Sequence, residues 1–517
     1  MSTKTLELQE RTEGKSLYSY QKGAIDKIFK CFEEAPEDYH LLYQLPTGGG
    51  KTVIFSEIVR QYLKHHKKQV LVMTHRIELC KQTSNMLTEF GVSNKIVDSK
   101  ADLSDQGDFN CFVAMVETLN NRLTDNKLDI SDIGLVIIDE AHYNSFTKLF
   151  KFFEKSFILG VTATPLSSNI NLPMKDNYNE LIVGETIQSL IENEFLARAE
   201  IFSYNVGLTS LVVGANGDYT VKSSEDLYTN TDMLTKLIQA YEERCKGKKT
   251  LIFNNGINTS LHVYDTFRRA GYPVAHLDNN NTKKERKAIL KWFKETPDAI
   301  LTSVSILTTG FDEPTVDCIM LNRATKSLTL YYQMIGRGSR ILKNKNKFIV
   351  IDLGNNLHRF GPWGSDLDWH KIFRSPNYYL DGILSDEELE NNFRYEMPED
   401  LREQFKKSDH VYFDIKKCYI DSIRAGESSK VVLERSIQHH AHICTENSED
   451  LWDALALAKL LGDDIDYRIS RYTKCISKST FNFVEWLKDD YRKKLNAYLR
   501  TNFDEIFEDI NGFPPED

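Results

Sequence analysis

Short apolar runs alternate with longer amphipathic stretches from about Leu17 to Pro165. The runs are almost continuously apolar, which is typical of parallel strands covered by helices on both faces. A series of such strands separated by helices predicts a doubly wound α/β sheet. The strands predicted in this first series are His40–Leu45, Gln69–His75, Cys111–Glu117, Gly134–Ala141 and Phe157–Pro165.

A second series with the same pattern begins near Lys248, and helices such as Lys283–Glu295 lie between its apolar runs. The chain is therefore expected to hold two α/β domains in tandem. Gly207–Asp226 lies between the two series, is rich in Gly, Ser and Asn, and predicts an irregular connection or a β-hairpin. The strands predicted in the second series are Lys249–Asn255, Pro273–Asn279, Ala299–Ser305, Asp317–Asn322 and Lys347–Leu353.

Beyond about Ser375 the pattern changes to helical spacing with dense charge, which predicts a mostly helical C-terminal domain. We expect three parts: residues 1–200, residues 201–375 with a connecting segment at 201–247, and a helical accessory domain at 376–517. The C-terminal domain is a candidate surface for protein partners.

Composition narrows the class of protein. The chain has 517 residues, of which 41% are hydrophobic and 27% charged, so several folded cores are expected rather than disorder. The N-terminal stretch lacks the apolar segment of a secretory signal, and no apolar run approaches the length of a membrane span. Eight scattered cysteines without a CxxC pair predict reduced thiols in a cytoplasmic protein. The net charge of −10 argues against a broad basic surface, while a local positive groove is compatible with it.

A glycine-rich segment, "QLPTGGGKTV", lies between the first predicted strand and a helical stretch at Val53–Lys64. Glycines at this position let backbone N–H groups converge on phosphate oxygens, and the helix N-terminus adds its positive end. Lys51 would neutralise phosphates and Thr52 would bind Mg²⁺. The strict motif has glycine where Leu45 stands, so a plain strand–helix turn is the alternative. The predicted nucleotide-binding residues here are Thr47, Gly48, Gly49, Gly50, Lys51 and Thr52.

Two adjacent acids, Asp139 and Glu140, end the apolar run "LVIIDEAH". Ligands bind at the carboxyl ends of strands in sheets of this kind. Asp139 can hold Mg²⁺, and Glu140 can act as a general base on the attacking water. A helix N-cap is the structural alternative for the pair.

An ordered set of motifs from Leu17 to about Trp363 resembles superfamily 2 helicases of the DEAD/DEAH-box type. The segments that carry the resemblance are "LYSYQ", "PTGGGKT", "THRIEL", "DEAH", "TATP", "LIFNNG", "TSVSILTTGFDEP" and "QMIGRGSR". The resemblance implies two RecA-like domains that bind ATP and Mg²⁺ between them. "TTGFDEP", "YQMIGRGSR" and "VIDLGNNLHRFGP" look most like the bacterial RadD-like DNA-repair branch, although the cysteine-ligated zinc module of that branch is missing here.

Individual roles follow from the resemblance. Arg337 and Arg340 would be arginine fingers facing the γ-phosphate, and Gln333 would lie near the attacking water. Gln21 would read adenine, while Gly310 and Asp312 would contact the ribose side. His142, Thr162 and Thr164 would couple hydrolysis to movement along the strand. The predicted contacts to the nucleic-acid backbone are Arg76, Thr118, Thr302 and Ser303.

One further cluster, "QHHAHIC", suits a metal because His439 and His442 could share a helical face, but a polar helix surface is the commoner explanation. The function indicated is an ATP-dependent helicase or translocase that acts on DNA, without sequence preference, in repair or recombination. A motor subunit of a restriction or phage-defence system and an RNA helicase are the alternatives.

Overall fold

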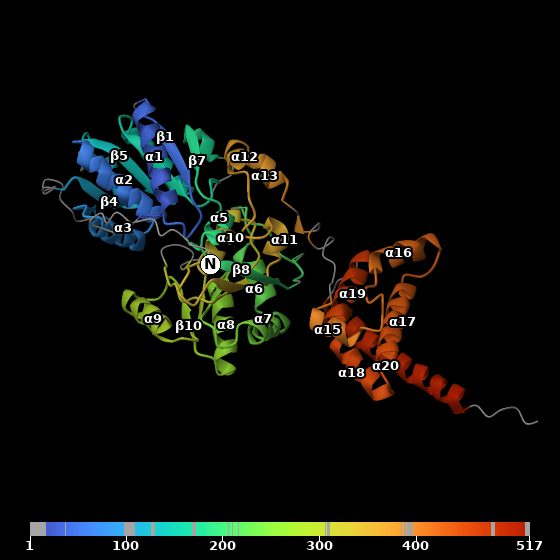
Figure 1. Cartoon of the computed structure of the whole chain (residues 1–517). Coiled ribbons are helices and arrows are strands. Elements are labelled where there is room, and N and C mark those ends of the chain that lie inside the picture. Colours follow the sequence, from blue (N-terminus) through green and yellow to red (C-terminus); the bar gives the residue numbers. More distant parts are fainter. Residues whose placement is uncertain are drawn as a thin grey trace, which may run out of the picture. The chain divides into compact units, whose positions relative to one another are not determined.

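The computed structural model describes residues 17–36, 38–97, 109–125, 130–167, 172–204, 206–208, 210–215, 217–304, 307, 311–383, 385–386, 389, 397–476 and 481–511. Contacts between residues divide the chain into two compact units, residues 1–391 and 392–517. The first unit contains two β-sheets, and the described part of the second unit is helical (Figure 1). The predicted fold class, two parallel-sheet α/β domains followed by a helical region, is confirmed.

The first sheet has seven strands in the order β3-β4-β2-β5-β6-β1-β7, all paired in parallel. Its central strands are buried, apart from the first residue of β2, because helices cover both faces of the sheet. The strands are β1 (His40–Gln44), β2 (Gln69–Thr74), β3 (Lys95–Val97), β4 (Cys111–Met115), β5 (Ile133–Asp139), β6 (Phe157–Thr162) and β7 (Glu180–Val183). The helices of this lobe are α1 (Ser19–Glu34), α2 (Lys51–His65), α3 (Ile77–Glu89), α4 (Val116–Thr124), η2 (Asn144–Phe152), η3 (Met174–Asp176) and α5 (Ile187–Glu192).

The second sheet has six parallel strands in the order β10-β11-β9-β12-β13-β8. The strands are β8 (Arg198–Ser203), β9 (Thr250–Asn254), β10 (Val274–Leu277), β11 (Ile300–Ser303), β12 (Cys318–Asn322) and β13 (Lys347–Asp352). The helices that follow or connect them are α6 (Val221–Tyr228), α7 (Thr231–Arg244), α8 (Ile257–Arg269), α9 (Lys283–Glu295), α10 (Leu328–Ile335), α11 (Asn356–Phe360), α12 (Trp369–Arg374) and α13 (Pro376–Asp381). We refer to the two sheets with their helices as the first and second lobes.

The pattern of apolar runs located ten strands and missed β3, β7 and β8. All three lie at an edge of their sheet. Edge strands are covered less completely, and several of their residues are half-buried or exposed, so the continuous apolar signal is lost. The predicted strand Cys111–Glu117 ends at Met115, because Val116 already begins α4.

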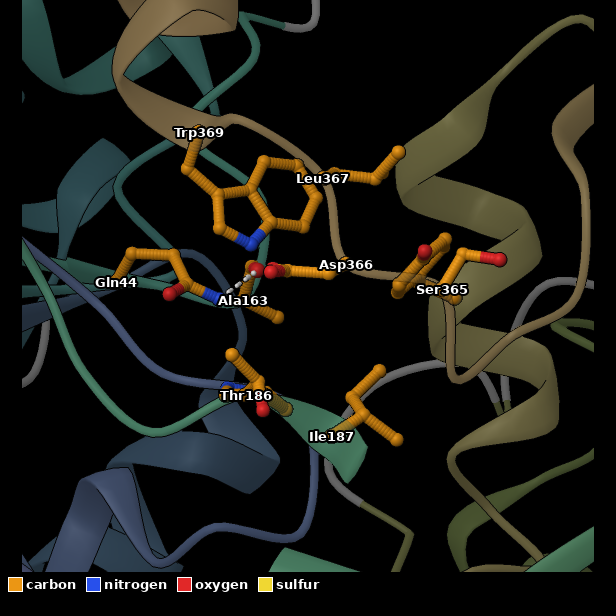
Figure 2. Close-up of a pocket in the computed structure, with 10 residues that line it drawn as sticks. Gln44, Ala163, Thr186, Ile187, Ser365, Asp366, Leu367 and Trp369 are labelled. Atoms are coloured by element: carbon orange, nitrogen blue, oxygen red, sulfur yellow. Dashed lines mark hydrogen bonds between the residues drawn. The ribbon is translucent and has the colours of Figure 1, made fainter. Parts of the chain in front are cut away.

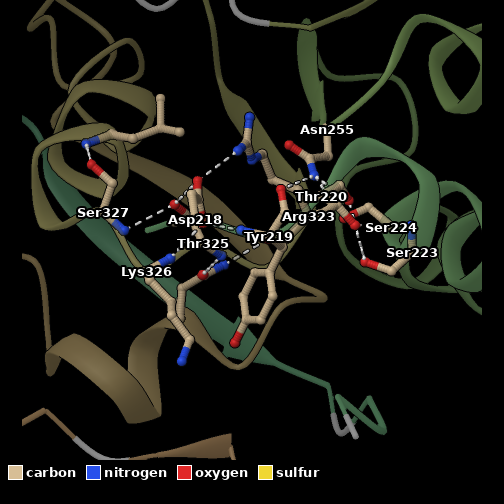
Figure 3. A network of polar contacts seen from close by, with 12 residues as sticks. Asp218, Tyr219, Thr220, Ser223, Ser224, Asn255, Arg323, Thr325, Lys326 and Ser327 are labelled. Carbon is tan, nitrogen blue, oxygen red and sulfur yellow. Dashed lines mark hydrogen bonds and ion pairs between the residues drawn. The ribbon is translucent and has the colours of Figure 1, made fainter. Parts of the chain in front are cut away.

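The segment between β8 and α7 folds as a hairpin followed by α6, with an antiparallel bridge between Val213 and Tyr219. Figure 3 shows how Asp218 fastens this hairpin to the loop after β12. Its carboxylate accepts hydrogen bonds from Arg323 Nη2 (3.2 Å), Thr325 Oγ1 (2.8 Å) and the Lys326 backbone N–H (2.8 Å). The predicted choice between an irregular connection and a hairpin is thereby resolved in favour of a hairpin.

The chain that leaves the second lobe returns to the first. After β13 and α11 it runs past α10 to α12, which packs on β7 and η3 of the first lobe (Figure 1). Trp369 at the start of α12 lies against Tyr332 of α10, with ring centroids 6.0 Å apart. Figure 2 shows Trp369 and Asp366 beside Gln44 and Ala163, where a small pocket separates the return segment from the first lobe.

Two of the eight cysteines are joined. Cys245, which follows α7, and Cys318, the first residue of β12, form a disulfide with 6.3 Å between their Cα atoms. Both are fully buried. The prediction that the cysteines are all reduced thiols is therefore wrong for this pair, because residues 73 positions apart are brought together by a parallel sheet that spacing alone does not reveal.

The second unit is a bundle around one apolar core. No helix among the described residues combines the length and apolar character needed to cross a bilayer. The helices of this unit are α15 (Glu399–Gln404), α16 (Ile415–Arg424), α17 (Lys430–Asn447), α18 (Leu451–Leu460), α19 (Gly462–Cys475) and α20 (Phe481–Asn511).

A buried polar network crosses this core. Asp464 Oδ2 lies 2.8 Å from both Arg468 Nη2 and His440 Nε2, and Tyr491 OH lies 2.9 Å from His440 Nδ1. Burial, and then the charge of Arg468, lower the pKa of His440 to about 3, so this histidine is neutral at neutral pH. Among the described residues no three His, Cys, Asp or Glu side chains are grouped to hold a metal ion. His440 thus serves the packing of the bundle, whereas His439 is half-buried and His442 is exposed and lies beside Glu446.

Replacing Asp464 with alanine should destabilise the second unit by about 3–5 kcal/mol, because Arg468 would be left as an uncompensated buried charge. Hydrogen exchange of the full chain measures this directly, through the protection of the amides in α17 and α19. Asp466→Ala is the matched control, since Asp466 is partly exposed and pairs with Lys488 and Arg492 near the surface. Equal loss of protection in the two variants would contradict a structural role for the buried network.

Candidate active site

The glycine-rich loop forms a concave turn between β1 and α2. Gly48 and Gly50 have φ values of 93° and 87°, a region that other residues seldom adopt. A Cβ on Gly48 would lie 2.6 Å from Arg340 Nη1, and one on Gly50 would lie 2.5 Å from Gln21 Nε2. Glycine is therefore needed at both positions, for the backbone conformation and for the close approach of side chains from outside the loop.

Lys51 begins α2 and is buried. Its Nζ donates a hydrogen bond to the backbone oxygen of Leu45, 3.1 Å away. Burial lowers the pKa of Lys51, while the charges of Glu140 and Asp139 raise it. The ammonium thus lies between the loop and the two acids, and Thr52 follows it in the half-buried first turn of α2.

The two acids lie at the carboxyl end of β5. Asp139 ends the strand and accepts a hydrogen bond from the Glu140 backbone N–H at 3.0 Å. Glu140 has φ of 54°, an uncommon conformation for a residue with a side chain. Burial and the charge of Glu140 raise the pKa of Asp139 to about 7. Although burial opposes it, the charges of Lys51 and His142 hold the pKa of Glu140 below its usual value, so Glu140 is the ionised member of the pair.

Two arginines of the second lobe reach this region. They follow α10, and Arg337 Nη1 donates to the backbone oxygen of Phe311 at 2.5 Å, while Arg340 Nε donates to Asp312 Oδ1 at 2.7 Å. Burial, with the charge of Arg340, lowers the pKa of Arg337 to about 10, and Glu140 acts in the opposite direction. The charges of Arg337 and Arg340 also lower the pKa of Lys51. The predicted cationic and acidic groups therefore converge from two lobes.

The lobes meet along this line in several further contacts. In the connection that leads into β8, the Ala197 N–H donates to the backbone oxygen of Ser339 at 2.8 Å. A Cβ on Gly336 would lie 2.7 Å from Cβ of Thr47, so α10 ends directly against the phosphate loop. Thr164 Oγ1 donates to Thr329 Oγ1 at 2.8 Å. Sequence reasoning missed Thr329, although it stands four residues before Gln333 in the last motif.

The predicted coupling residues form a connected chain in the structure. His142 Nδ1 lies 3.1 Å from Thr162 Oγ1 and 3.4 Å from Glu140 Oε2. Thr162 Oγ1 donates to the backbone oxygen of Thr164 at 2.9 Å, and Thr164 continues to the second lobe. This chain links the end of β5 to α10 through the end of β6, which is a suitable arrangement for coupling.

The predicted adenine reader, Gln21, is buried in the first turn of α1. Its Oε1 accepts a hydrogen bond from the Tyr18 backbone N–H at 3.0 Å, so it also caps the helix. Tyr20, which sequence reasoning did not single out, donates from its hydroxyl to the Gly49 backbone oxygen at 2.7 Å. Phe195 packs on Tyr18 and Tyr20 at centroid distances of 4.5 and 5.1 Å. An aromatic cluster thus holds this end of the site.

The four predicted nucleic-acid contacts fall into two groups. Arg76, before α3, and Thr118, in α4, are half-buried at the carboxyl edge of the first sheet. Thr302 and Ser303 are fully buried, and their hydroxyls bond to Asn254 Nδ2 and to the Leu277 backbone oxygen, both at 2.8 Å. Neither hydroxyl is accessible to a strand here, so these two contacts conflict with the structure. Gly310 lies outside the described residues, whereas Asp312 is exposed and pairs with Arg340.

The residues present fit a nucleotide with a divalent cation. Four polar atoms at the site are buried without a hydrogen-bond partner: Thr47 Oγ1, Glu140 Oε2, Gln333 Nε2 and Arg340 Nη1. Such groups are normally satisfied in a protein, so a bound polar ligand would complete them. One carboxylate and one hydroxyl suit Mg²⁺, which takes its other ligands from phosphates and water.

Comparison with known proteins gives two family matches. Residues 14–167 match the model of "Type III restriction enzyme, res subunit", and residues 230–342 match the "Helicase conserved C-terminal domain". The first match holds the phosphate loop and the acids, and the second holds the arginines. One model therefore covers the groups that the first lobe brings to the site, and the other covers those of the second lobe.

Individual proteins are similar to the chain over about two thirds of its length. A 51.5 kDa protein of a Lactococcus phage is 29% identical over 64% of this chain and 69% of its own length. IRC3 of Saccharomyces cerevisiae, named as a candidate ATP-dependent helicase, is 28% identical over 65% of this chain, which spans about half (51%) of that protein. A structure of the ATP-dependent restriction-modification enzyme LlaBIII bound to DNA shares the fold with a TM-score of 0.52, at 17% identity over 66% of this chain and 28% of that one. The matches to a restriction-enzyme subunit and to a helicase C-terminal domain, with a relative named as an ATP-dependent helicase, support an ATP-hydrolysing superfamily 2 helicase.

Proposed function

We propose that this helicase moves along DNA, and that ATP hydrolysis between the two lobes drives the movement in repair or recombination. The observation that carries the proposal is the convergence of Lys51 and Glu140 from the first lobe with Arg337 from the second. Arg337 can act on a nucleotide bound beside Lys51 and Glu140 only while the two lobes are together. Hydrolysis can therefore be linked to a cycle of closing and opening, provided that the nucleotide binds the closed state more tightly.

Each side chain at the site has its own role in ATP hydrolysis. Lys51 exchanges the Leu45 oxygen for a phosphate oxygen, and Glu140 accepts the proton of the attacking water. Arg337 and Arg340 stabilise the negative charge that develops during transfer. Gln333 orients the water with its free amide group. A bound Mg²⁺, held by Thr52 and Asp139, would neutralise phosphate charge.

Backbone contact with the strand would come from Arg76 and Thr118 at the carboxyl edge of the first sheet. Phosphate contacts position a strand without reading its sequence, and binding through them weakens as salt rises. A cytoplasmic location and the RadD-like branch of the superfamily belong to the same proposal. The location rests on the six cysteines that stay free, although the Cys245–Cys318 disulfide counts against it, and the branch rests on the motif spelling.

A motor subunit of a restriction or phage-defence system is the second candidate. It is favoured by the match of residues 14–167 to a restriction-enzyme subunit and by the fold shared with LlaBIII. Such a motor would move along duplex DNA while a partner protein cuts it. RNA is the third possible track, because the motifs themselves do not select the nucleic acid.

ATPase assays with different nucleic acids test these alternatives. We expect single-stranded or branched DNA to raise kcat above its value without nucleic acid, because a bound strand favours the productive arrangement of the lobes. Preference for duplex DNA would favour the restriction-type motor, and stimulation by RNA alone would contradict the proposal. Raising the salt concentration should weaken the stimulation by DNA and leave the rate without DNA largely unchanged.

A further inference from the structure

Three aromatic rings join the ends of two neighbouring strands in the first lobe. His75 follows β2, and His142 and Tyr143 follow β5, its parallel neighbour. The Tyr143 ring centroid lies 4.2 Å from that of His75 and 4.3 Å from that of His142, with interplanar angles of 33° and 37°. The three rings therefore pack as one continuous stack, with Tyr143 in the middle.

The polar atoms of the outer ring, His75, form no hydrogen bond in the structure. Both ring nitrogens of His75 are buried without a hydrogen-bond partner. Burial lowers the pKa of His75 to about 4, so the ring is neutral at neutral pH. A buried polar group without a partner is unfavourable, and phenylalanine would fill the same space without that penalty. The polarity of His75 thus points to a second arrangement of the site in which a ring nitrogen finds a partner.

The stack lies between two charged groups with different predicted tasks. Arg76 is the next residue after His75, and its charge lowers the pKa of both His75 and Tyr143. The carboxylate of Glu140 acts on the same two groups in the opposite sense. His142, at the inner end of the stack, lies 3.4 Å from Glu140 Oε2. One end therefore faces the predicted strand contact, and the other faces the predicted general base.

We propose that the His75–Tyr143–His142 stack transmits nucleic-acid binding at Arg76 to Glu140. The inference rests on the proposed function, since it requires a strand that contacts Arg76. A phosphate held by Arg76 shifts the adjacent His75, and the tilted contact between the two rings passes the shift to Tyr143. Tyr143 is three residues from Glu140, so it moves the turn that sets the direction of the carboxylate. His75 and Tyr143 are positioning residues, because neither contacts the reacting atoms.

The left-handed backbone of Glu140 makes this turn responsive. A residue held in a sparsely populated conformation depends on its surroundings to stay there. A small change in the packing of Tyr143 can therefore change how often Glu140 adopts its productive direction. Strand binding would then raise the fraction of productive molecules, which is a population shift rather than new chemistry.

Tyr143→Leu and Tyr143→Phe test the stack as a matched pair, measured with and without single-stranded DNA. The leucine variant removes the ring, and we expect it to keep the basal kcat and the DNA affinity while losing most of the stimulation by DNA. The phenylalanine variant keeps the ring and should retain the stimulation of the wild type. His75→Leu removes the outer ring. It should lose the stimulation by DNA and keep the basal kcat, as Tyr143→Leu does.

Each outcome separates the inference from the function on which it rests. Full stimulation in both leucine variants, or a parallel fall of basal and stimulated rates, would overturn the role of the stack. A wild-type enzyme that no DNA or RNA stimulates would instead overturn the proposed function, and the inference with it. Thermal unfolding of each variant shows whether it folds. If Tyr143→Leu does not fold, the stimulation of His75→Leu by DNA tests the role of the stack instead.

Discussion

Glu140→Gln is expected to lower kcat for ATP hydrolysis by about 10²–10⁴-fold, the usual contribution of a general base, while ATP still binds. Glutamine has the same shape but cannot accept the proton of the attacking water. Glu140 suits this task because Lys51 and His142 keep its pKa low, and because its Oε2 is buried without a hydrogen-bond partner. Steady-state hydrolysis together with equilibrium binding of a fluorescent ATP analogue measures both quantities.

The control for this substitution is Glu117→Gln, at an exposed glutamate of the same lobe that pairs with Lys148. It should leave hydrolysis unchanged. Wild-type turnover in Glu140→Gln would remove Glu140 as the base. Loss of ATP binding in that variant would instead assign the residue to nucleotide affinity.

Arg337→Ala is expected to lower kcat by about 10³–10⁵-fold, as removal of an arginine finger does in other nucleotide hydrolases. The guanidinium lies buried at the meeting of the lobes, bonded to the Phe311 oxygen, and it is within electrostatic reach of Glu140. Its contribution is made mainly in the transition state, so nucleotide affinity should change much less than kcat. Single-turnover hydrolysis and nucleotide binding, measured on the same protein, distinguish the two effects.

Arg337→Lys adds a second test, because lysine keeps the charge but cannot form the planar fork of two parallel hydrogen bonds. It should recover only part of the lost rate. Arg268→Ala removes an exposed arginine of the same lobe that pairs with Asp265, and it should have no effect. Equal losses of affinity and kcat in Arg337→Ala would show that the residue holds the ground state instead.

The central strands and the phosphate loop could be predicted from sequence because their signals are local. A continuous apolar run specifies a buried parallel strand, and three glycines before Lys51 specify a turn into a helix. The edge strands β3, β7 and β8 lack such a run, since solvent covers part of them. The disulfide between Cys245 and Cys318 depends on tertiary contact alone.

Side-chain direction was the less predictable part of the site. In a strand covered on both faces, alternation carries no information, so the inward hydroxyls of Thr302 and Ser303 could not be foreseen. The contacts of Thr329 and Tyr143 join segments that are distant in sequence or belong to no motif of the superfamily. Motif spelling locates the groups that perform chemistry, whereas the side chains that connect them become visible only in the folded lobes.

The return of α12 to β7 and η3 limits how far the two lobes can separate. The chain joins the lobes before β8 and after α11, and it returns to the second lobe beyond α13, where Asp386 pairs with Arg359. The lobes are therefore tethered at more than one point. A large separation of the lobes would break the contact between Trp369 and Tyr332 of α10. It would also disturb α10, the helix that carries Gln333 and ends just before Arg337. We therefore expect the lobes to separate only by small distances, so that the arginines stay near the phosphate loop.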